Sequence, residues 1–214
     1  MKFCRECGTP CEDETVFCRV CGTRFHTYVS EIDAGFTTAY FVTDNDTMEA
    51  VLDRPVILIA NEVISDIRTI LPLLEEVVKN KRQVLIIVDK LEGEVNVTLI
   101  VNKLKGVLAC AAIETHELGE KRKDILEDIG ILTGGYVFSS DSELELQNAT
   151  LSICGQAKEV RIAEDKTIIT GGYGDESKII DRIYQLREEI SAAQSEADKE
   201  IIRNRLNNMF CFIE

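Results

Sequence analysis

Short apolar runs alternate with amphipathic stretches through most of the chain. The runs at 56–60, 84–88 and 107–113 have the length and composition of buried strands. Between them, residues 62–79 and 92–105 repeat apolar positions at the three- and four-residue spacing of a helix. The alternation predicts an α/β domain in which helices cover at least one face of the strands.

Shorter elements continue this pattern towards the C-terminus. A charged helix is expected from Glu120 to about Gly130, with short strands at 136–138, 160–162 and 167–169. The end of the chain predicts a helical hairpin whose second arm is capped by Ser195. The apolar positions of its two arms are Ile179, Ile183, Leu186 and Ile190, then Ile201, Ile202, Leu206 and Met209.

Two segments interrupt the regular pattern. Residues 26–34 show no periodicity and are expected to form a linker. Pro72 falls inside the helix expected at 62–79, where a missing N–H and a ring clash should kink or loosen it.

The helix expected at 92–105 carries apolar stripes on two opposite faces. The first stripe is Val97, Ile100, Val101 and Leu104, and the second is Val95 and Leu99. At 100° per residue the two stripes lie about 170° apart. One stripe can face the core, whereas the other is either covered by a further layer or open to solvent as an apolar binding surface. Periodicity does not separate these two interpretations.

The overall composition is that of a folded protein with an acidic surface. Of the 214 residues, 45% are hydrophobic and 29% are charged, and the net charge is −14. This charge would repel nucleic acids and anionic membranes. No apolar stretch reaches the roughly 18–20 residues of a membrane helix, and the N-terminus lacks the apolar region of a signal peptide. We therefore expect a cytoplasmic protein that binds neither nucleic acid nor membranes.

Five of the eight cysteines lie within the first 21 residues. The pairs Cys4-x-x-Cys7 and Cys18-x-x-Cys21 supply four thiolates for one tetrahedral Zn²⁺, and the glycine after each pair lets backbone N–H groups point at the sulfurs. A segment of about 25 residues has too small a core to fold alone, so zinc binding would supply its folding free energy. The pattern resembles a zinc ribbon over residues 1–25 and predicts one structural zinc.

Several alternatives remain open for the cysteines. Cys11 is a spare thiol that could exchange with Cys7, His26 is a weaker candidate ligand, and reversible redox chemistry is a further option. A catalytic zinc is not expected, because four thiolates leave no position for water. Residues 1–25 carry four basic and four acidic side chains, which favours a structural or protein-facing role. The scattered cysteines are expected to be buried apolar residues. They are Cys110, Cys154 and Cys211.

The α/β region lacks the signals of nucleotide binding and catalysis. No G-x-G-x-x-G follows the first strand, and no G-x-x-x-x-G-K-[ST] occurs. The Gly-rich segment 171–174 precedes Asp175 and Glu176, whose charges would oppose an anion, so a plain turn is expected. With only two histidines there is no catalytic set. We therefore expect no ATP site and no enzymatic activity.

Several motifs occur in the order and spacing of the apical domain of GroEL-type (group I) chaperonins. They are 40–42, 55–60, 64–68 leading to 71–75, 85–87, 92–94, 101–102, Gly106, 132–135, 149–151 and 155–158. The chain resembles this family from about Ala34 to Met209, without its equatorial and intermediate domains. The resemblance implies a layered β/β/α apical-type core in residues 35–214, which the linker at 26–34 joins to the ribbon.

The resemblance also implies a function. In the family, a hydrophobic groove between two parallel helices binds non-native polypeptides and the co-chaperonin. Here the helices would be 62–79 and 92–105, and the site residues follow by position. They are Phe36, Tyr40, Phe41, Leu71, Leu74, Asn96, Ile100, Val101 and Asn102. The implied partners are unfolded or extended polypeptides, with a co-chaperonin or chaperonin-related protein as a further candidate. A monomer is expected, because ring assembly in the family depends chiefly on the missing equatorial part.

Two departures from the family pattern favour a narrower role. Asn96 stands where the family has a groove leucine, which should weaken apolar capture. The segment 114–123 lacks the proline and the phenylalanine that the family has there. A specific adaptor that recognises one partner peptide is therefore the alternative to a minichaperone-like protein that binds unfolded clients without ATP.

Overall fold

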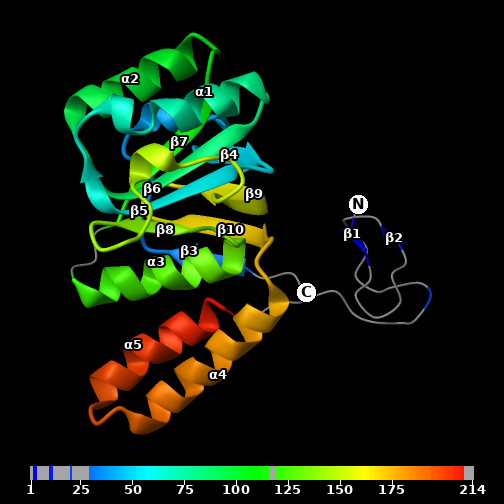
Figure 1. The fold of residues 1–214 in the computed structure, drawn as a ribbon, viewed down its shortest axis with the longest axis vertical. Helices are drawn as coiled ribbons and strands as arrows, with labels where there is room; N and C mark the ends of the chain where they lie inside the picture. Colours follow the sequence, from blue (N-terminus) through cyan, green and yellow to red (C-terminus); the bar gives the residue numbers. More distant parts are fainter. Residues whose placement is uncertain (1, 4–9, 12–19, 21–28, 116–118, 210–214) are drawn as a thin grey trace.

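The structure is a computed structural model that describes residues 2–3, 10–11, 20, 29–115 and 119–209. Its main part is a mixed α/β fold with an eight-stranded mixed sheet and five α-helices (Figure 1). The strands of this sheet are β3 (Val29–Ile32), β4 (Ala50–Asp53), β5 (Val56–Ile64), β6 (Gln83–Leu91), β7 (Ala109–Glu114), β8 (Val137–Ser139), β9 (Gly155–Ile162) and β10 (Thr167–Gly172). The helices are α1 (Leu71–Lys79), α2 (Gly93–Leu104), α3 (Glu120–Thr133), α4 (Glu176–Ala192) and α5 (Glu196–Asn207).

The sheet has the strand order β3-β10-β9-β5-β6-β7, with β4 paired to β9 and β8 paired to β5. Strands β5, β6 and β7 run parallel, and the apolar runs at 56–60 and 84–88 are fully buried. Parallel strands bury both faces, which explains their continuous apolar sequence. Figure 1 shows α1 and α2 on one side of the sheet, α3 on the other, and the α4–α5 hairpin beyond α3. The predicted α/β class is thus confirmed.

The helix expected at 62–79 is shorter than predicted. Strand β5 continues to Ile64, a 3₁₀ turn η2 (Ile67–Thr69) follows, and α1 begins only at Leu71. Pro72 therefore lies in the first turn of α1, where its missing N–H costs no helical hydrogen bond. The predicted proline kink was wrong for this reason.

The linker expected at 26–34 contains a strand. Residues 29–32 form β3, which pairs antiparallel with β10. Ser30 and Ile32 are buried whereas Glu31 is exposed, so the strand alternates, but over too few residues for the period to be recognised. Residues 26–28 lie outside the described part of the chain.

Helix α3 runs past Gly130 and ends at Gly134, which adopts a left-handed conformation with φ of 73°. Gly130 lies inside the helix because of close packing on β8: an added Cβ would lie 2.9 Å from Cγ2 of Val137. A glycine that serves packing was therefore mistaken for a helix end.

The C-terminal hairpin agrees with the prediction. The Ser195 hydroxyl accepts a hydrogen bond from the N–H of Asp198 and caps α5, and the Asp175 carboxylate accepts one from Ser177 and caps α4. Of the Gly-rich segment 171–174, where a plain turn was expected, Gly171 and Gly172 end β10 and only the residues after them connect to α4. Gly174 is needed for close packing, since a Cβ there would lie 2.0 Å from the carbonyl oxygen of Ile131. None of the described helices combines the length and apolar character that a membrane crossing requires.

Strands β1 (Lys2–Phe3) and β2 (Pro10–Cys11) form a separate antiparallel pair. Lys2 pairs with Cys11 and Phe3 with Pro10, so the chain reverses direction between the two strands. This interval contains the first cysteine pair, whose members, like Cys18 and Cys21, lie outside the described residues.

Candidate functional site

Helix α2 buries one apolar stripe and exposes the other. Val95 and Leu99 are 0% and 1% exposed and belong to the main core. On the opposite side, Val97, Val101 and Leu104 are 57%, 40% and 66% exposed. We call these three residues the α2 strip. Within the described part of the chain, the strip is open to solvent and no further layer covers it.

The buried stripe fixes the orientation of α2. The N–H of Glu92 donates to the carbonyl of Ile64, which ties the start of the helix to the end of β5. The carbonyl of Leu99 lies 3.8 Å from the Cys110 sulfur of β7. Ile100 is partly buried and packs against the core, so the open strip is narrower than the four-residue stripe read from the sequence.

Lys103 holds the 3₁₀ turn η1 (Ala39–Phe41) against α2. Its Nζ donates to the carbonyl oxygens of Tyr40 at 3.0 Å and Val42 at 3.1 Å, and it lies 5.8 Å from the centre of the Phe41 ring. Partial burial lowers the pKa of Lys103. Tyr40 remains 62% exposed on this turn, which contacts α2.

The nine predicted groove residues divide into three groups by exposure. Tyr40, Leu71 and Val101 are exposed and available to a ligand. Phe41 and Leu74 are buried in the core, so they support the site without reaching a ligand in this conformation. The remaining four are partly buried: Phe36, Asn96, Ile100 and Asn102. Leu71 is the first residue of α1. The turn η2, which precedes α1, contacts both α1 and α2, so Leu71 lies on the same side of the molecule as α2.

Hydrogen bonds fix two polar side chains of α2. The Thr37 hydroxyl donates to the side-chain oxygen of Asn96 at 3.2 Å, and the Asn102 amide donates to the carbonyl of Thr98 at 2.8 Å. The family-derived positions did not include Val97 and Leu104, although the helical stripe contains both. Periodicity was therefore the better signal for which side chains are exposed.

Sequence reasoning missed a buried ion cluster that joins three helices. The Asp128 carboxylate of α3 accepts hydrogen bonds from Nε of Arg182 at 2.7 Å and from Nε of Arg205 at 2.8 Å. Arg205 also contacts Asp124 at 2.8 Å. Burial alone would lower the pKa of Arg205, but its acidic partners outweigh that effect and raise it. The only sequence signal was the spacing that places Arg182 on the buried side of α4, between Ile179 and Leu186.

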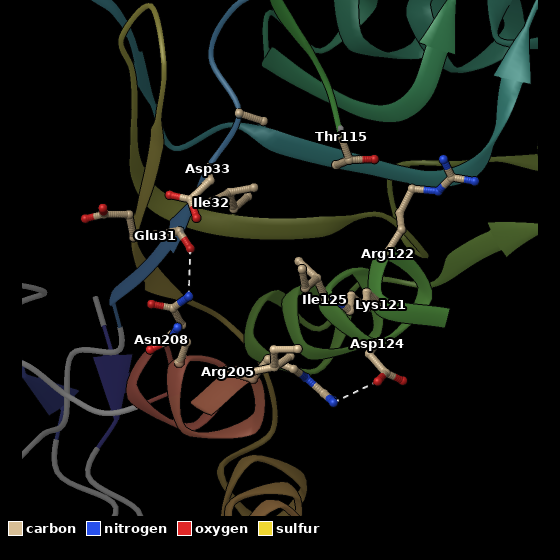
Figure 2. Close-up of a pocket in the computed structure, with 13 residues that line it drawn as sticks. Glu31, Ile32, Asp33, Thr115, Lys121, Arg122, Asp124, Ile125, Arg205 and Asn208 are labelled. Atoms are coloured by element: carbon tan, nitrogen blue, oxygen red, sulfur yellow. Dashed lines mark hydrogen bonds and ion pairs between the residues drawn. The ribbon is translucent and has the colours of Figure 1, made fainter. Parts of the chain in front are cut away.

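A pocket of about 170 Å³ lies between β3, α3 and α5 (Figure 2). Acidic and basic groups both line it, and Arg205 is paired with Asp124. The amide of Asn208 donates to the carbonyl oxygen of Glu31 across one side of the pocket.

The described residues contain no group of three or more His, Cys, Asp or Glu side chains placed to hold a metal ion. The predicted zinc ligands fall outside them.

Cys110 and Cys154 are buried, as predicted, and burial raises the pKa of each thiol to about 12. At pH 9 only about one thousandth of each would be thiolate, whereas an ordinary thiol is mostly ionised. We expect neither to react with iodoacetamide at pH 9 until the protein is unfolded. Peptide mass spectrometry with and without denaturant would measure this, and rapid native alkylation would contradict it.

The α2 strip is the arrangement best placed to act on another molecule. It combines exposed aliphatic side chains on a helix whose other face is anchored in the core. Such a surface gains free energy by removing apolar area from water, and it requires no proton transfer or cofactor. No model of a known protein family matches the chain.

Proposed function

We propose that the protein binds non-native or extended polypeptide segments along the α2 strip without ATP, as a minichaperone-like module with a structural zinc ribbon. The observation that carries this proposal is the solvent exposure of Val97, Val101 and Leu104 on a helix anchored by its opposite face. The sequence resemblance to the chaperonin apical domain supports it independently.

The energetics favour weak and promiscuous binding. Burial of about 400 Å² of apolar surface at about 25 cal/mol/Å² gives about 10 kcal/mol before costs. Association and the ordering of a flexible segment remove most of this amount. The net charge of −14 would help to keep a protein with an exposed apolar strip in solution.

Leu104→Glu is expected to impair this binding. Leu104 is 66% exposed, so the substitution should leave the core intact while it places a charge on the strip. Loss of one buried leucine from the complex should weaken client binding about tenfold. The readout is light scattering by a chemically denatured protein that aggregates on dilution, with and without this protein.

Tyr173→Glu is the matched control. Tyr173 is 55% exposed just before α4, so this substitution adds the same charge at an exposed position away from the strip. The control should suppress aggregation as well as the wild type. If Leu104→Glu also does so, the strip does not bind clients.

A specific adaptor is the second candidate function. Asn96 precedes Val97 in α2 and its side-chain oxygen accepts a hydrogen bond from Thr37, so a ligand that reaches this polar position from the strip would be preferred over a purely apolar one. In this function one partner peptide, which a co-chaperonin or chaperonin-related protein could supply, binds more tightly than unrelated sequences. Competition between unrelated peptides distinguishes the two functions, since only a promiscuous site lets all of them compete.

A further inference from the structure

Helix α4 has an exposed face of regular composition that the function proposed above does not use. Its buried side packs through Ile179, Arg182 and Leu186. The opposite side carries seven exposed residues at helical spacing, which we call the α4 face. They are Ser177, Ile180, Asp181, Tyr184, Arg187, Glu188 and Ser191. Figure 1 shows α4 in the outermost layer, beyond α3.

On the α4 face, complementary residues lie at equal distances before and after Tyr184, which is 60% exposed. Asp181 and Arg187 lie three residues before and after it, and they carry opposite charges. Ser177 and Ser191 lie seven residues before and after it, and both are small. If two copies of α4 pack antiparallel with Tyr184 at the centre, each Asp181 faces Arg187 of the other copy. Two identical ion pairs form in this way, as a twofold interface requires.

The same face carries a projection and a matching hollow. Ile180 is an exposed apolar side chain, 42% accessible, on the N-terminal side of Tyr184. On the C-terminal side, a shallow hollow is lined by Tyr184, Arg187, Glu188, Ser191 and Ala192. Its first four members have the i, i+3, i+4, i+7 spacing of a hole that accepts one side chain of a facing helix. The antiparallel pairing places Ile180 opposite Glu188, one of the residues that line this hole.

We propose that the α4 face binds a second copy of this chain in an antiparallel α4–α4 contact. Ile180 of each copy enters the hollow of the other, and Asp181 pairs with Arg187 across the interface. The Arg187 guanidinium lies 5.9 Å from the Tyr184 ring, which places its charge near the centre of the contact. Tyrosine and arginine are also the residue types that most often dominate binding energy at interfaces.

This contact would be a weak one. It uses seven residues of each copy, whereas a stable interface of standard size uses about 20–30 on each side. The dimer should therefore dissociate on dilution. This proposal differs from the sequence analysis, which predicted a monomer.

Swapping the two charges tests the proposed ion pair between Asp181 of one copy and Arg187 of the other. Sedimentation velocity of the full zinc-loaded chain over a wide concentration range should show a concentration-dependent dimer. Asp181→Arg alone and Arg187→Asp alone each create two like-charge contacts and should weaken dimerisation about tenfold or more. The double variant Asp181→Arg/Arg187→Asp should restore it, and an equal mixture of the two single variants should form heterodimers.

Several outcomes would overturn the proposal. A wild-type protein that is monomeric at every concentration would mean that the α4 face does not bind a second copy of the chain. A dimer unaffected by either single variant would use another surface, and a double variant that stays monomeric would exclude this register. Because both positions are exposed, far-UV circular dichroism should show unchanged folding in all variants.

Discussion

Asp128→Ala is expected to lower the free energy of unfolding by about 3–5 kcal/mol, the usual cost of removing one partner from a buried ion pair. The Asp128 side chain is only 8% exposed, and those of Arg182 and Arg205 are 9% and 8% exposed. Arg182 would lose its shortest carboxylate contact, and Arg205 would lose one of its two carboxylate partners at 2.8 Å. Water cannot easily replace it at this depth, so two charges would remain poorly compensated.

The loss should be concentrated in the C-terminal hairpin. Asp128 lies on α3, whereas Arg182 is on α4 and Arg205 on α5, so one carboxylate joins all three helices. The apolar cluster between these helices is small and includes Leu132, Ile179, Leu186 and Met209. Urea denaturation would give the overall loss. Hydrogen exchange should show the amides of α4 and α5 losing protection before those of β5 and β6.

Asp124→Asn is the matched control for this effect. Asp124 contacts the same Arg205, at 2.8 Å, but its side chain is 40% exposed. An ion pair with this access to water contributes less than about 1 kcal/mol. Equal losses in the two variants would show that burial of Asp128 does not determine the stability of the hairpin.

The sequence predicted the strands that are buried on both faces, but it missed β3, β4 and the outer part of β5, each of which is partly exposed. The runs at 56–60 and 84–88 are continuous because helices and neighbouring strands cover them. The outer part of β5 was assigned to a helix instead, because its pairing with β6 shifts register between Ala60 and Val63 and its side chains are half exposed. Strand β4 was missed for the same reason, since only two of its four residues are buried.

The residues of the candidate site could be predicted from the sequence, but which of the two stripes of α2 is exposed to solvent could not. Helical spacing identified both stripes of α2, yet each is apolar enough to face a core. Packing of Leu99 beside Cys110 of β7 decides which stripe is buried, and that contact joins elements that periodicity treats separately. The Asp128 cluster was missed because charged side chains are usually solvated, and only their three-dimensional pairing permits burial here.

If residues 1–25 hold the zinc expected from their cysteine pairs, its removal should unfold this segment and leave the α/β domain folded. Structural zinc sites of this kind contribute about 10–16 kcal/mol of binding free energy, and here that energy would be the folding free energy of the ribbon. Metal analysis of protein purified without added zinc should find about one ion per chain, as four thiolate ligands imply. After chelation, the cysteines of the ribbon should become reactive to iodoacetamide, while Cys110 and Cys154 stay protected by burial.

Single cysteine variants separate the ligands from the spare thiol. Cys18→Ser should lose the zinc, since three thiolates hold it far more weakly and the spare Cys11 lies closer in the sequence to Cys7 than to Cys18. Cys11→Ser should keep it, because Cys11 lies on β2, paired with Lys2, outside both Cys-x-x-Cys pairs. If Cys7→Ser also keeps the zinc, Cys11 has taken its place as the fourth ligand. A metal-free chain whose N-terminal cysteines resist alkylation would contradict the zinc ribbon, because no other source of folding free energy is expected in so short a segment.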